Sequence, residues 1–348
     1  MDEFARIRHW THGRQSADMQ RRQGVVLGIG DDAAVVEPPA DETEPLQWVL
    51  AVDTMVETVH FADATMSEED VGYKALAANV SDIAAMGGVP RHALVSVSVP
   101  PSYGPDRMRR LYDGLYACAD RYGVAVIGGD TTSSPQHLVI AVTVIGTVAA
   151  GRALRRSGAQ PGDAVFVTGP VGLSAAGLHW LLARQNDPLA QPPPEAAALV
   201  RAHRRPAPSV RAGQLLAARG TCRSLNDVSD GLASEAWEIA EASGVRLVLR
   251  EALLPRSGSL AAYASRAGVD PLEWMLYGGE DYVLVGTLAA DDAEAAKAAF
   301  AAEGLPFYVI GETEAGDPGV ELVVRSERRG AEERRVPLAK RGYNHFGG

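Results

Sequence analysis

The stretch Ser67–Val99, SEEDVGYKALAANVSDIAAMGGVPRHALVSVSV, predicts a helix followed directly by a strand. Ser67 can cap the helix, and the three acids after it suit the positive end of the helix dipole. Apolar residues then recur at helical spacing as far as Met86, where Gly87-Gly88 and a proline end the pattern. The segment 92–99 is predicted to be a strand. A helix next to a strand is the basic unit of an α/β fold.

Strands and helices alternate on both sides of this stretch. In the first half, strands are predicted at 25–30, 48–53, 92–99, 124–127 and 138–148, and helices at 67–86 and 105–122. In the second half, strands are predicted at 164–167, 245–249, 282–288 and 307–310, and helices at 172–184, 209–219, 231–243 and 290–303. Residues 188–208 contain six prolines and are expected to be irregular.

Two domains are expected for a chain of 348 residues, at roughly 100–200 residues per domain. The polar, turn-rich connector GRALRRSGAQPGD begins at Gly151 and gives the boundary. The prediction is an α/β protein with an N-terminal domain at 1–150 and a C-terminal domain at 151–348.

The composition excludes several classes of protein. The net charge of −11, from 44 acidic and 33 basic residues, argues against a nucleic-acid binder. Cys118 and Cys222 form no C-x-x-C pair, so a disulfide framework or a thiolate zinc site is not expected. No apolar run is long enough to span a membrane, and the N-terminus does not resemble a secretory signal. The expected location is therefore the cytoplasm.

Aspartates fall at or just after the ends of predicted strands. They occur in Gly30-Asp31-Asp32, Val52-Asp53, Gly129-Asp130 and Asp227-Val228-Ser229-Asp230. Taken singly, each could be a turn residue. Ligands gather at strand ends in sheet-based folds, however, and several carboxylates in one place would repel each other without cations. Asp82 adds a further carboxylate, three residues after Asn79 on one helix face. Oxygen ligands of this kind suit Mg²⁺, which usually combines them with phosphate oxygens.

Other sequence patterns do not support competing chemistries. Gly28-x-Gly30-x-x-Ala33 resembles a dinucleotide fingerprint, but Pro38-Pro39 prevents the helix that such a loop requires. There is no GxxxxGK[ST] phosphate loop and no G-x-S-x-G nucleophile motif. Among the scattered histidines only His60 is a candidate, because it closely follows the Asp53 strand.

The motifs together resemble the thiamine-monophosphate kinase family over essentially the whole chain. In order, the segments that carry the resemblance are GIGDDA (28–33), DT (53–54) with HF (60–61), NVSDIAAMG (79–87), GGDTT (128–132), GRALRRSGAQPG (151–162), DVSDGL (227–232), GGEDY (278–282) and GYNHF (342–346). The acidic motifs are shared loosely by a wider superfamily that includes aminoimidazole ribonucleotide synthetase. GGEDY and GYNHF are more specific to the kinase.

This resemblance implies ATP-dependent phosphorylation of thiamine phosphate to thiamine diphosphate. It implies a homodimer that forms through the N-terminal domain, and a C-terminal domain that completes the nucleotide and substrate site. Carried over by motif position, the Mg²⁺ ligands would be Asp32, Asp53, Asp82, Asp130, Asp227 and Asp230. ATP would contact Gly129, Arg156 and Ser229. Thiamine phosphate would contact His60, Glu280 and Tyr343.

The implied chemistry needs no general base. The acceptor is a phosphate monoester whose second pKa lies near ~6, so its oxygen is already ionised at neutral pH. We therefore expect direct in-line transfer, with several Mg²⁺ ions offsetting the phosphate charges. The sequence departs from the family pattern at Ala51 and Val52, where hydroxyl residues usually precede Asp53, so side-chain ligation is lost there. It also departs at Val59, where a polar residue commonly precedes His60.

Two alternatives stay open at this point. One is another ATP-dependent enzyme of the same superfamily. The hydrogenase maturation protein works through a C-terminal cysteine, whereas this sequence ends HFGG, and selenophosphate synthetase needs a reactive residue near its N-terminus, whereas the first cysteine here is Cys118. The other is a non-catalytic protein that binds Mg-nucleotide, which a turnover assay would distinguish.

Overall fold

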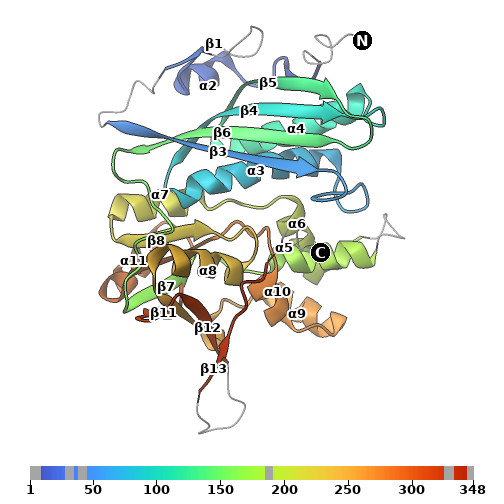
Figure 1. Ribbon diagram of the computed structural model, residues 1–348. Helices are drawn as coiled ribbons and strands as arrows, with labels where there is room; N and C mark the ends of the chain where they lie inside the picture. The colour runs from blue at the N-terminus through green and yellow to red at the C-terminus, as the bar shows by residue number, and fades with distance from the viewer. Residues whose placement is uncertain (1–8, 28–34, 38–44, 185–190, 325–332, 343–348) are drawn as a thin grey trace. The chain divides into compact units, whose positions relative to one another are not determined.

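The computed structural model describes residues 9–27, 35–37, 45–184, 191–324 and 333–342. The chain forms two compact units: unit 1 comprises Met1–Ile83 and Gly88–Gly151, and unit 2 comprises Ala84–Gly87 and Arg152–Gly348. Each unit is a mixed layer of sheet and helices (Figure 1), so the chain has the predicted α/β class. No helix among these residues is long and apolar enough to cross a membrane.

Unit 1 is built on a four-stranded sheet in the order β3-β6-β4-β5. The strands are β3 (Leu46–Val56), β4 (Val89–Val99), β5 (Ala125–Ser133) and β6 (Val139–Ala149). β6 pairs antiparallel with both β3 and β4, whereas β4 and β5 are parallel. β3 and β5 are therefore the two edges of this sheet (Figure 1).

Helices α3 (Glu68–Ala85) and α4 (Pro105–Tyr122) pack against each other through glycines. A Cβ on Gly114 would lie 1.7 Å from the carbonyl oxygen of Glu69, and one on Gly72 would lie 1.9 Å from that of Leu111. The two helices therefore approach backbone to backbone. Helix α2 (Ala17–Arg22) and the short pair β1 (Val25–Leu27) and β2 (Val35–Val36) also belong to this unit.

Unit 2 is built on a seven-stranded sheet in the order β13-β12-β9-β11-β7-β10-β8. The strands are β7 (Asp163–Val167), β8 (Cys222–Asp227), β9 (Arg246–Arg250), β10 (Leu284–Ala289), β11 (Tyr308–Glu314), β12 (Gly319–Val324) and β13 (Arg334–Pro337). The helices are α5 (Leu173–Ala183), α6 (Pro194–Arg204), α7 (Val210–Arg219), α8 (Leu232–Ser243), α9 (Gly258–Ala267), α10 (Pro271–Tyr277) and α11 (Ala293–Ala302).

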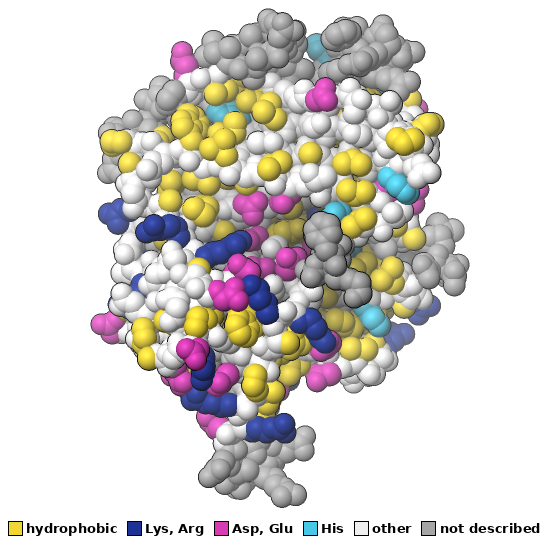
Figure 2. All heavy atoms as spheres, in the orientation of Figure 1, with side chains coloured by type: hydrophobic (Ala, Val, Ile, Leu, Met, Phe, Trp, Pro, Cys, Tyr) yellow, Lys and Arg dark blue, Asp and Glu magenta, His cyan; other side chains and the backbone are white. Residues whose placement is uncertain are grey.

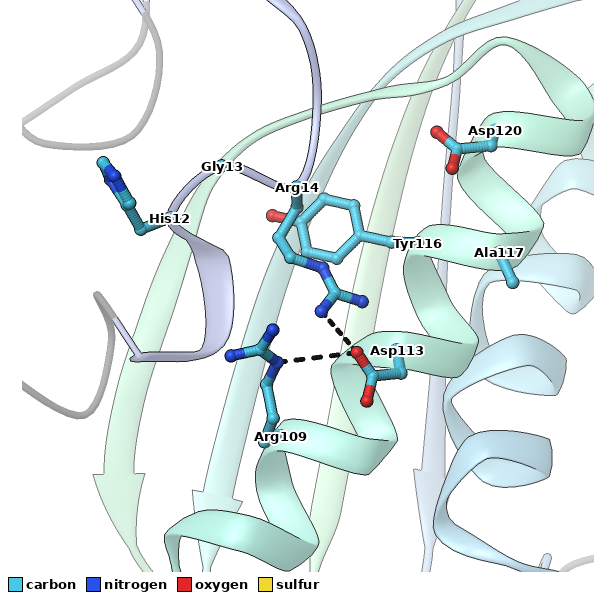
Figure 3. A pocket seen from close by; sticks show the side chains of 8 residues that line it. All are labelled: His12, Gly13, Arg14, Arg109, Asp113, Tyr116, Ala117 and Asp120. Atoms are coloured by element: carbon cyan, nitrogen blue, oxygen red, sulfur yellow. Dashed lines mark ion pairs between the residues drawn. The ribbon is translucent and has the colours of Figure 1, made fainter.

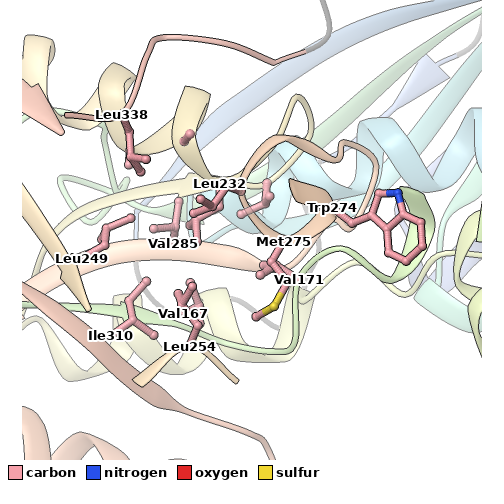
Figure 4. Close-up of a cluster of buried hydrophobic side chains, with 14 of the residues drawn as sticks. Val167, Val171, Leu232, Leu249, Leu254, Trp274, Met275, Val285, Ile310 and Leu338 are labelled. Atoms are coloured by element: carbon pink, nitrogen blue, oxygen red, sulfur yellow. The ribbon is translucent and has the colours of Figure 1, made fainter. Parts of the chain in front are cut away.

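Both faces of this sheet are buried. Along β7, Val165 and Val167 face a core shared with α5, α6, α8, α9 and α10 (Figure 4). The alternate residues Ala164 and Phe166 face a second core with α7 and α11. This alternation is the two-residue period of a strand with helices on both sides.

Helix α6 corrects the sequence-based expectation that residues 188–208 are irregular. Its 11 residues begin at Pro194, which follows Pro193 as the residue before the helix. Proline fits the first helical position, where its missing N–H has no partner to lose. The alanine-rich segment that follows favours a helix, and it buries Ala196, Leu199 and Val200 in the core. Helices α9 and α10 were also not predicted.

Candidate functional site

In unit 1, helix α3 places polar side chains beside the carboxyl half of β3. The backbone N–H of Asp53 donates to Oδ1 of Asn79 at 2.9 Å, and Nδ2 of Asn79 donates to the carbonyl of Ala75 at 3.0 Å. Asn79 is fully buried, so this contact ties the edge strand to the helix. Asp82 lies three residues further along α3, on the same side of the helix. Asp53 and Asn79 are therefore brought together, and Asp82 shares the helix side of Asn79 as the sequence predicted.

His60 lies in the tight turn after β3. Its Nδ1 accepts the backbone N–H of Val56 at 3.0 Å, so the neutral ring carries its proton on Nε2. Thr58 in the same turn has a left-handed backbone with φ of 70°. The Asp53 side chain is exposed to solvent on one side. Partial loss of water around its carboxylate nevertheless raises the pKa of Asp53, and the positive charge of protonated His60 opposes this rise. The turn thus holds His60 close to the Asp53 carboxylate.

Asp130 lies on the opposite edge of the same sheet. It pairs with Ser96 in register, and the preceding Gly129 has φ of 156°. A Cβ on Gly129 would lie 1.9 Å from the carbonyl oxygen of Val95, so only glycine fits there. Two strands separate β5 from β3, which puts Asp130 three strand spacings, roughly 14 Å, from Asp53. A single ion cannot touch both carboxylates of one chain.

In unit 2, the loop after β8 and the loop before β10 lie side by side. The N–H of Glu280 donates to the carbonyl of Ser229 at 2.6 Å, and that of Tyr282 donates to the carbonyl of Val228 at 2.9 Å. These contacts bring the DVSDGL motif next to GGEDY. The tail joins them, because a Cβ on Gly342 would lie 2.3 Å from the carbonyl oxygen of Asp230.

Two buried residues that the sequence analysis did not single out hold the β8–α8 loop. Asn226 on β8 and Glu235 in the first turn of α8 are each 3% exposed and bonded to each other. Burial raises the pKa of Glu235 to about 7, and the negative charge of Asp227 adds to this rise. The N–H of Asp230 opposes it by donating to the carboxylate.

Two further residues that the sequence analysis did not assign to the site lie next to Glu280. Asp281 is half-buried and accepts the N–H groups of Gly172 and Ser174 at the start of α5. Burial raises the pKa of Asp281 to about 7, while these N–H groups oppose the rise. The carboxylate of Glu280 lies 3.4 Å from Nδ1 of His203, a histidine that is 2% exposed on α6. Their partners are far away in sequence, which is why spacing did not reveal them.

Asp32 and Tyr343, together with Gly28, Gly30 and Asp31, lie outside the described residues. Within the described part of the chain, no group of three or more His, Cys, Asp or Glu residues could hold a metal by itself. The donors present are nevertheless the oxygens that Mg²⁺ takes: carboxylates on Asp53 and Asp82, and carboxylates on Asp227 and Asp230. Mg²⁺ usually needs only one or two carboxylates plus phosphate oxygens, so these donors fit it when a nucleotide is present.

A surface pocket in unit 1, of about 370 Å³, is lined by the N-terminal segment and α4 (Figure 3). Its two arginines, Arg14 and Arg109, both point to Asp113. Arg109 also donates to the carbonyl of His9 at 2.8 Å. The guanidinium groups therefore anchor the N-terminal segment on α4, and the pocket does not contribute to the candidate site.

Family models and relatives agree with this arrangement. Residues 30–148 match the AIR synthase related protein N-terminal domain, and residues 160–323 match the corresponding C-terminal domain. Thiamine-monophosphate kinase of Bacillus subtilis is 42% identical over 322 residues, which are 92% of this chain and 94% of that protein. The chain belongs to the thiamine-monophosphate kinase family.

Solved structures of the family share the fold. The crystal structure of thiamine-monophosphate kinase from Stenotrophomonas maltophilia has a TM-score of 0.79 at 35% identity, covering 90% of this chain and 96% of that one. A structure of AaThiL complexed with AMPPCP and TMP has a TM-score of 0.71 at 31% identity, covering 83% and 87%. Both family domains are thus represented in this chain, with the acidic motifs in each.

Proposed function

We propose that this protein phosphorylates thiamine phosphate at the expense of ATP, yielding thiamine diphosphate and ADP. The observation that carries the proposal is its membership of the thiamine-monophosphate kinase family over more than nine-tenths of the chain. The AaThiL structure with AMPPCP and TMP supports the choice of the two substrates. The side-by-side packing of the DVSDGL and GGEDY loops supports a site that serves nucleotide and acceptor together.

The proposed reaction is direct in-line transfer. An oxygen of the acceptor phosphate attacks the γ-phosphorus of ATP, the β–γ bridging P–O bond breaks, and ADP leaves with that electron pair. The acceptor oxygen is ionised at neutral pH, since its pKa lies near ~6, so no side chain has to remove a proton. His60, with its proton on Nε2 when neutral, would serve as a hydrogen-bond donor to a phosphate oxygen.

Six aspartates are proposed to hold Mg²⁺: Asp32, Asp53, Asp82, Asp130, Asp227 and Asp230. When bound, Mg²⁺ would offset the phosphate charges and the charge that develops on the transferred group. Ala51 and Val52 provide no side-chain oxygen, so the carboxylate of Asp53 carries more of the binding at its strand end.

The remaining contacts are proposed to divide between the substrates. Gly129, Arg156 and Ser229 would contact ATP, with the guanidinium of Arg156 offering a forked donor to a phosphate. His60, Glu280 and Tyr343 would contact thiamine phosphate. The packing of Gly342 against Asp230 supports the role of the tail, because Tyr343 is the next residue.

We further propose that the protein is a homodimer through the open face of the unit 1 sheet. Trp48, Leu50 and Val52 alternate along β3 and are 45%, 65% and 63% exposed. Hydrophobic side chains are spread over this face, with few charges among them (Figure 2). A second copy of the sheet would cover this apolar row. Asp53 and Asp130 of one chain are too far apart to bind the same ion. In a dimer, Asp53 of one copy would share an ion with Asp130 of the other copy.

The deciding experiment is to incubate the purified protein with Mg-ATP and thiamine phosphate and to separate thiamine diphosphate from its precursor. We expect one thiamine diphosphate per ADP formed, and no ADP when thiamine phosphate is left out. ADP formation without thiamine diphosphate would indicate another ATP-dependent enzyme of the superfamily. Nucleotide binding without turnover would indicate the non-catalytic alternative. A cytoplasmic location stays a prediction of the sequence.

A further inference from the structure

Asn226 and Glu235 connect three proposed site residues that lie on two separate segments of unit 2, namely Arg156 on one segment and Ser229 and Asp230 on the other. Oδ1 of Asn226 accepts from Nε of Arg156 at 3.1 Å, while its Nδ2 donates to Glu235 Oε2 at 2.5 Å. The other carboxylate oxygen of Glu235 accepts from Ser229 Oγ at 3.3 Å and from the N–H of Asp230 at 3.0 Å. The two side chains thus form one continuous buried network from Arg156 to the DVSDGL loop.

We propose that Asn226 and Glu235 are positioning residues for the nucleotide: they fix the guanidinium of Arg156 and the Ser229–Asp230 turn in their binding geometry. This inference rests on the proposed function, because it takes Arg156 and Ser229 as nucleotide contacts. Neither Asn226 nor Glu235 touches the nucleotide itself in this assignment.

The side chain of Arg156 shows why such a device is needed. It is 55% exposed, and a long exposed arginine loses substantial rotamer entropy when it binds a phosphate. The bond from Nε to Asn226 fixes the guanidinium plane before any ligand arrives and leaves the terminal nitrogens as donors. The outer contact of Nη1 with Glu238 is looser, at 3.6 Å.

Asparagine is suited to the middle of this network because it accepts and donates at once. Its oxygen faces a group that only donates, and its amide faces a carboxylate that only accepts when ionised. A leucine of similar size would break both contacts and leave Glu235 without its partner on β8. A buried polar group without a partner is costly, so the effect should reach the loop.

A role in helix capping alone is the competing explanation. Glu235 accepts the N–H of Asp230 just before α8, as an acid near a helix start often does. Capping, however, involves neither Asn226 nor Arg156. If Glu235 only caps the helix, its substitution should lower the stability of the protein and weaken the binding of both substrates equally. If it positions nucleotide contacts, its substitution should weaken nucleotide binding selectively.

The test compares Asn226→Leu and Glu235→Gln with Glu241→Gln, whose side chain on the same helix bonds to Lys340 at 2.7 Å. The measurements are the Kd of Mg-AMPPCP by calorimetry, the KM of both substrates and the melting temperature. We expect the nucleotide Kd and the KM of ATP to rise about tenfold in the first two variants, as for loss of a hydrogen bond to a charged group. The KM of thiamine phosphate should change less than twofold, and Glu241→Gln should match the wild type throughout.

A double variant tests whether Asn226 acts through Arg156. Arg156→Lys removes the Nε donor, so adding Asn226→Leu to it should weaken nucleotide binding little further. A nucleotide Kd within twofold of wild type, equal losses for both substrates, or failure of both variants to fold would each overturn the proposal. Because Kd is measured without turnover, wild-type protein that binds Mg-AMPPCP but makes no thiamine diphosphate would refute the proposed function while this comparison still stands.

Discussion

Glu280 carries an unusual backbone for a residue that is proposed to contact the substrate. Its φ is 65°, in the left-handed region that residues other than glycine rarely adopt. Its N–H is held by the carbonyl of Ser229, and its carboxylate lies near Nδ1 of His203. Strain of this kind persists where the surroundings fix the residue, and it is common at functional sites.

This strain predicts a difference between two small substitutions of Glu280. Both Glu280→Ala and Glu280→Gly remove the carboxylate, so both should raise the KM of thiamine phosphate by a similar factor. Only glycine relieves the left-handed backbone, so the free energy of unfolding should be about 1 kcal/mol higher for Glu280→Gly than for Glu280→Ala. Urea unfolding of the two variants measures this difference. An alanine variant as stable as the glycine variant would show that the backbone is not strained.

Asp53 is the described carboxylate from which we expect the largest loss of turnover. Asp53→Asn keeps the size of the side chain but removes its charge beside a strand end that already lacks the hydroxyl ligands. We expect kcat at limiting Mg²⁺ to fall about 100-fold or more, with partial recovery as Mg²⁺ is raised. Asp63→Asn is the control, since Asp63 pairs with Arg107 at 2.7 Å outside the proposed site. Equal turnover of the two variants at every Mg²⁺ concentration would contradict the metal assignment.

Helix α5 shows how an element of the scaffold depends on the GGEDY loop. Its first turn has no capping side chain of its own, and Gly172 at the cap has φ of 83°. Asp281 supplies the missing acceptor from more than a hundred residues away. The loop that presents Glu280 is therefore anchored to the start of a core helix.

The raised pKa of Asp281 makes this anchor dependent on pH. A carboxyl group whose pKa is higher in the folded state than in the unfolded chain stabilises the fold when protonated. Its contribution is complete below the unfolded value near 3.8 and is lost as the pH rises through about 7. Between these limits, Asp281 should make the free energy of unfolding fall by up to ~1.4 kcal/mol per pH unit.

Comparison of wild type with Asp281→Asn isolates this effect from other titrating groups. Between pH 5 and 7, the unfolding free energy of the variant should decrease less steeply with pH than that of wild type. The two slopes should differ by up to the amount that corresponds to one bound proton per molecule. Denaturant unfolding at several pH values gives both slopes. Parallel curves would mean that Asp281 stays ionised in the folded protein.

The sequence revealed the elements of unit 1 better than those of unit 2. Helix α3 was predicted to within one residue at each end, because Ser67 and Gly87-Gly88 mark its limits. Strand β5 runs on to Ser133, well past the predicted end at 127, because its glycines continue the parallel ladder with β4. The prolines before α6 hid a helix, since proline both stops helices and starts them.

The same limit applies to the candidate site. Spacing placed Asp82 and Asn79 on one helix face, predicted strand ends located Asp53 and Asp130, and the DVSDGL motif located Asp227, whose strand β8 was not predicted. Asn226, Glu235 and His203 were missed because only the folded chain brings them to their partners, and Asp281, although it lies in the quoted GGEDY motif, was missed because its partners are at the start of α5. The one local signal that could have identified Glu235, an acid in the first turn of the predicted helix 231–243, was not used.

At the scale of the whole molecule, the exposed row on β3 predicts the oligomeric state. Leu50→Glu places a charge in the middle of the apolar face and should convert a dimer of 36.8 kDa chains to monomers. Leu182→Glu, at another exposed leucine, is the control and should leave the mass unchanged. Light scattering after gel filtration measures both. A wild-type protein that is monomeric at micromolar concentration would refute the homodimer.

The placement of Asp53 and Asp130 on opposite sheet edges leads to a prediction about mixed dimers. If each site combines Asp53 of one copy with Asp130 of the other, a mixed dimer of Asp53→Asn and Asp130→Asn chains contains one fully altered site and one intact site. Random mixing makes half of the dimers mixed, so equal amounts of two inactive variants should recover about one quarter of wild-type turnover. If both aspartates served a site within one chain, every site in the mixture would be altered and no activity would return. The assay is thiamine diphosphate formation after the two variants are unfolded together and refolded, with each variant refolded alone as the control. Recovery only in the mixture would place the reaction between two copies, and its absence would require Asp53 and Asp130 to bind separate ions.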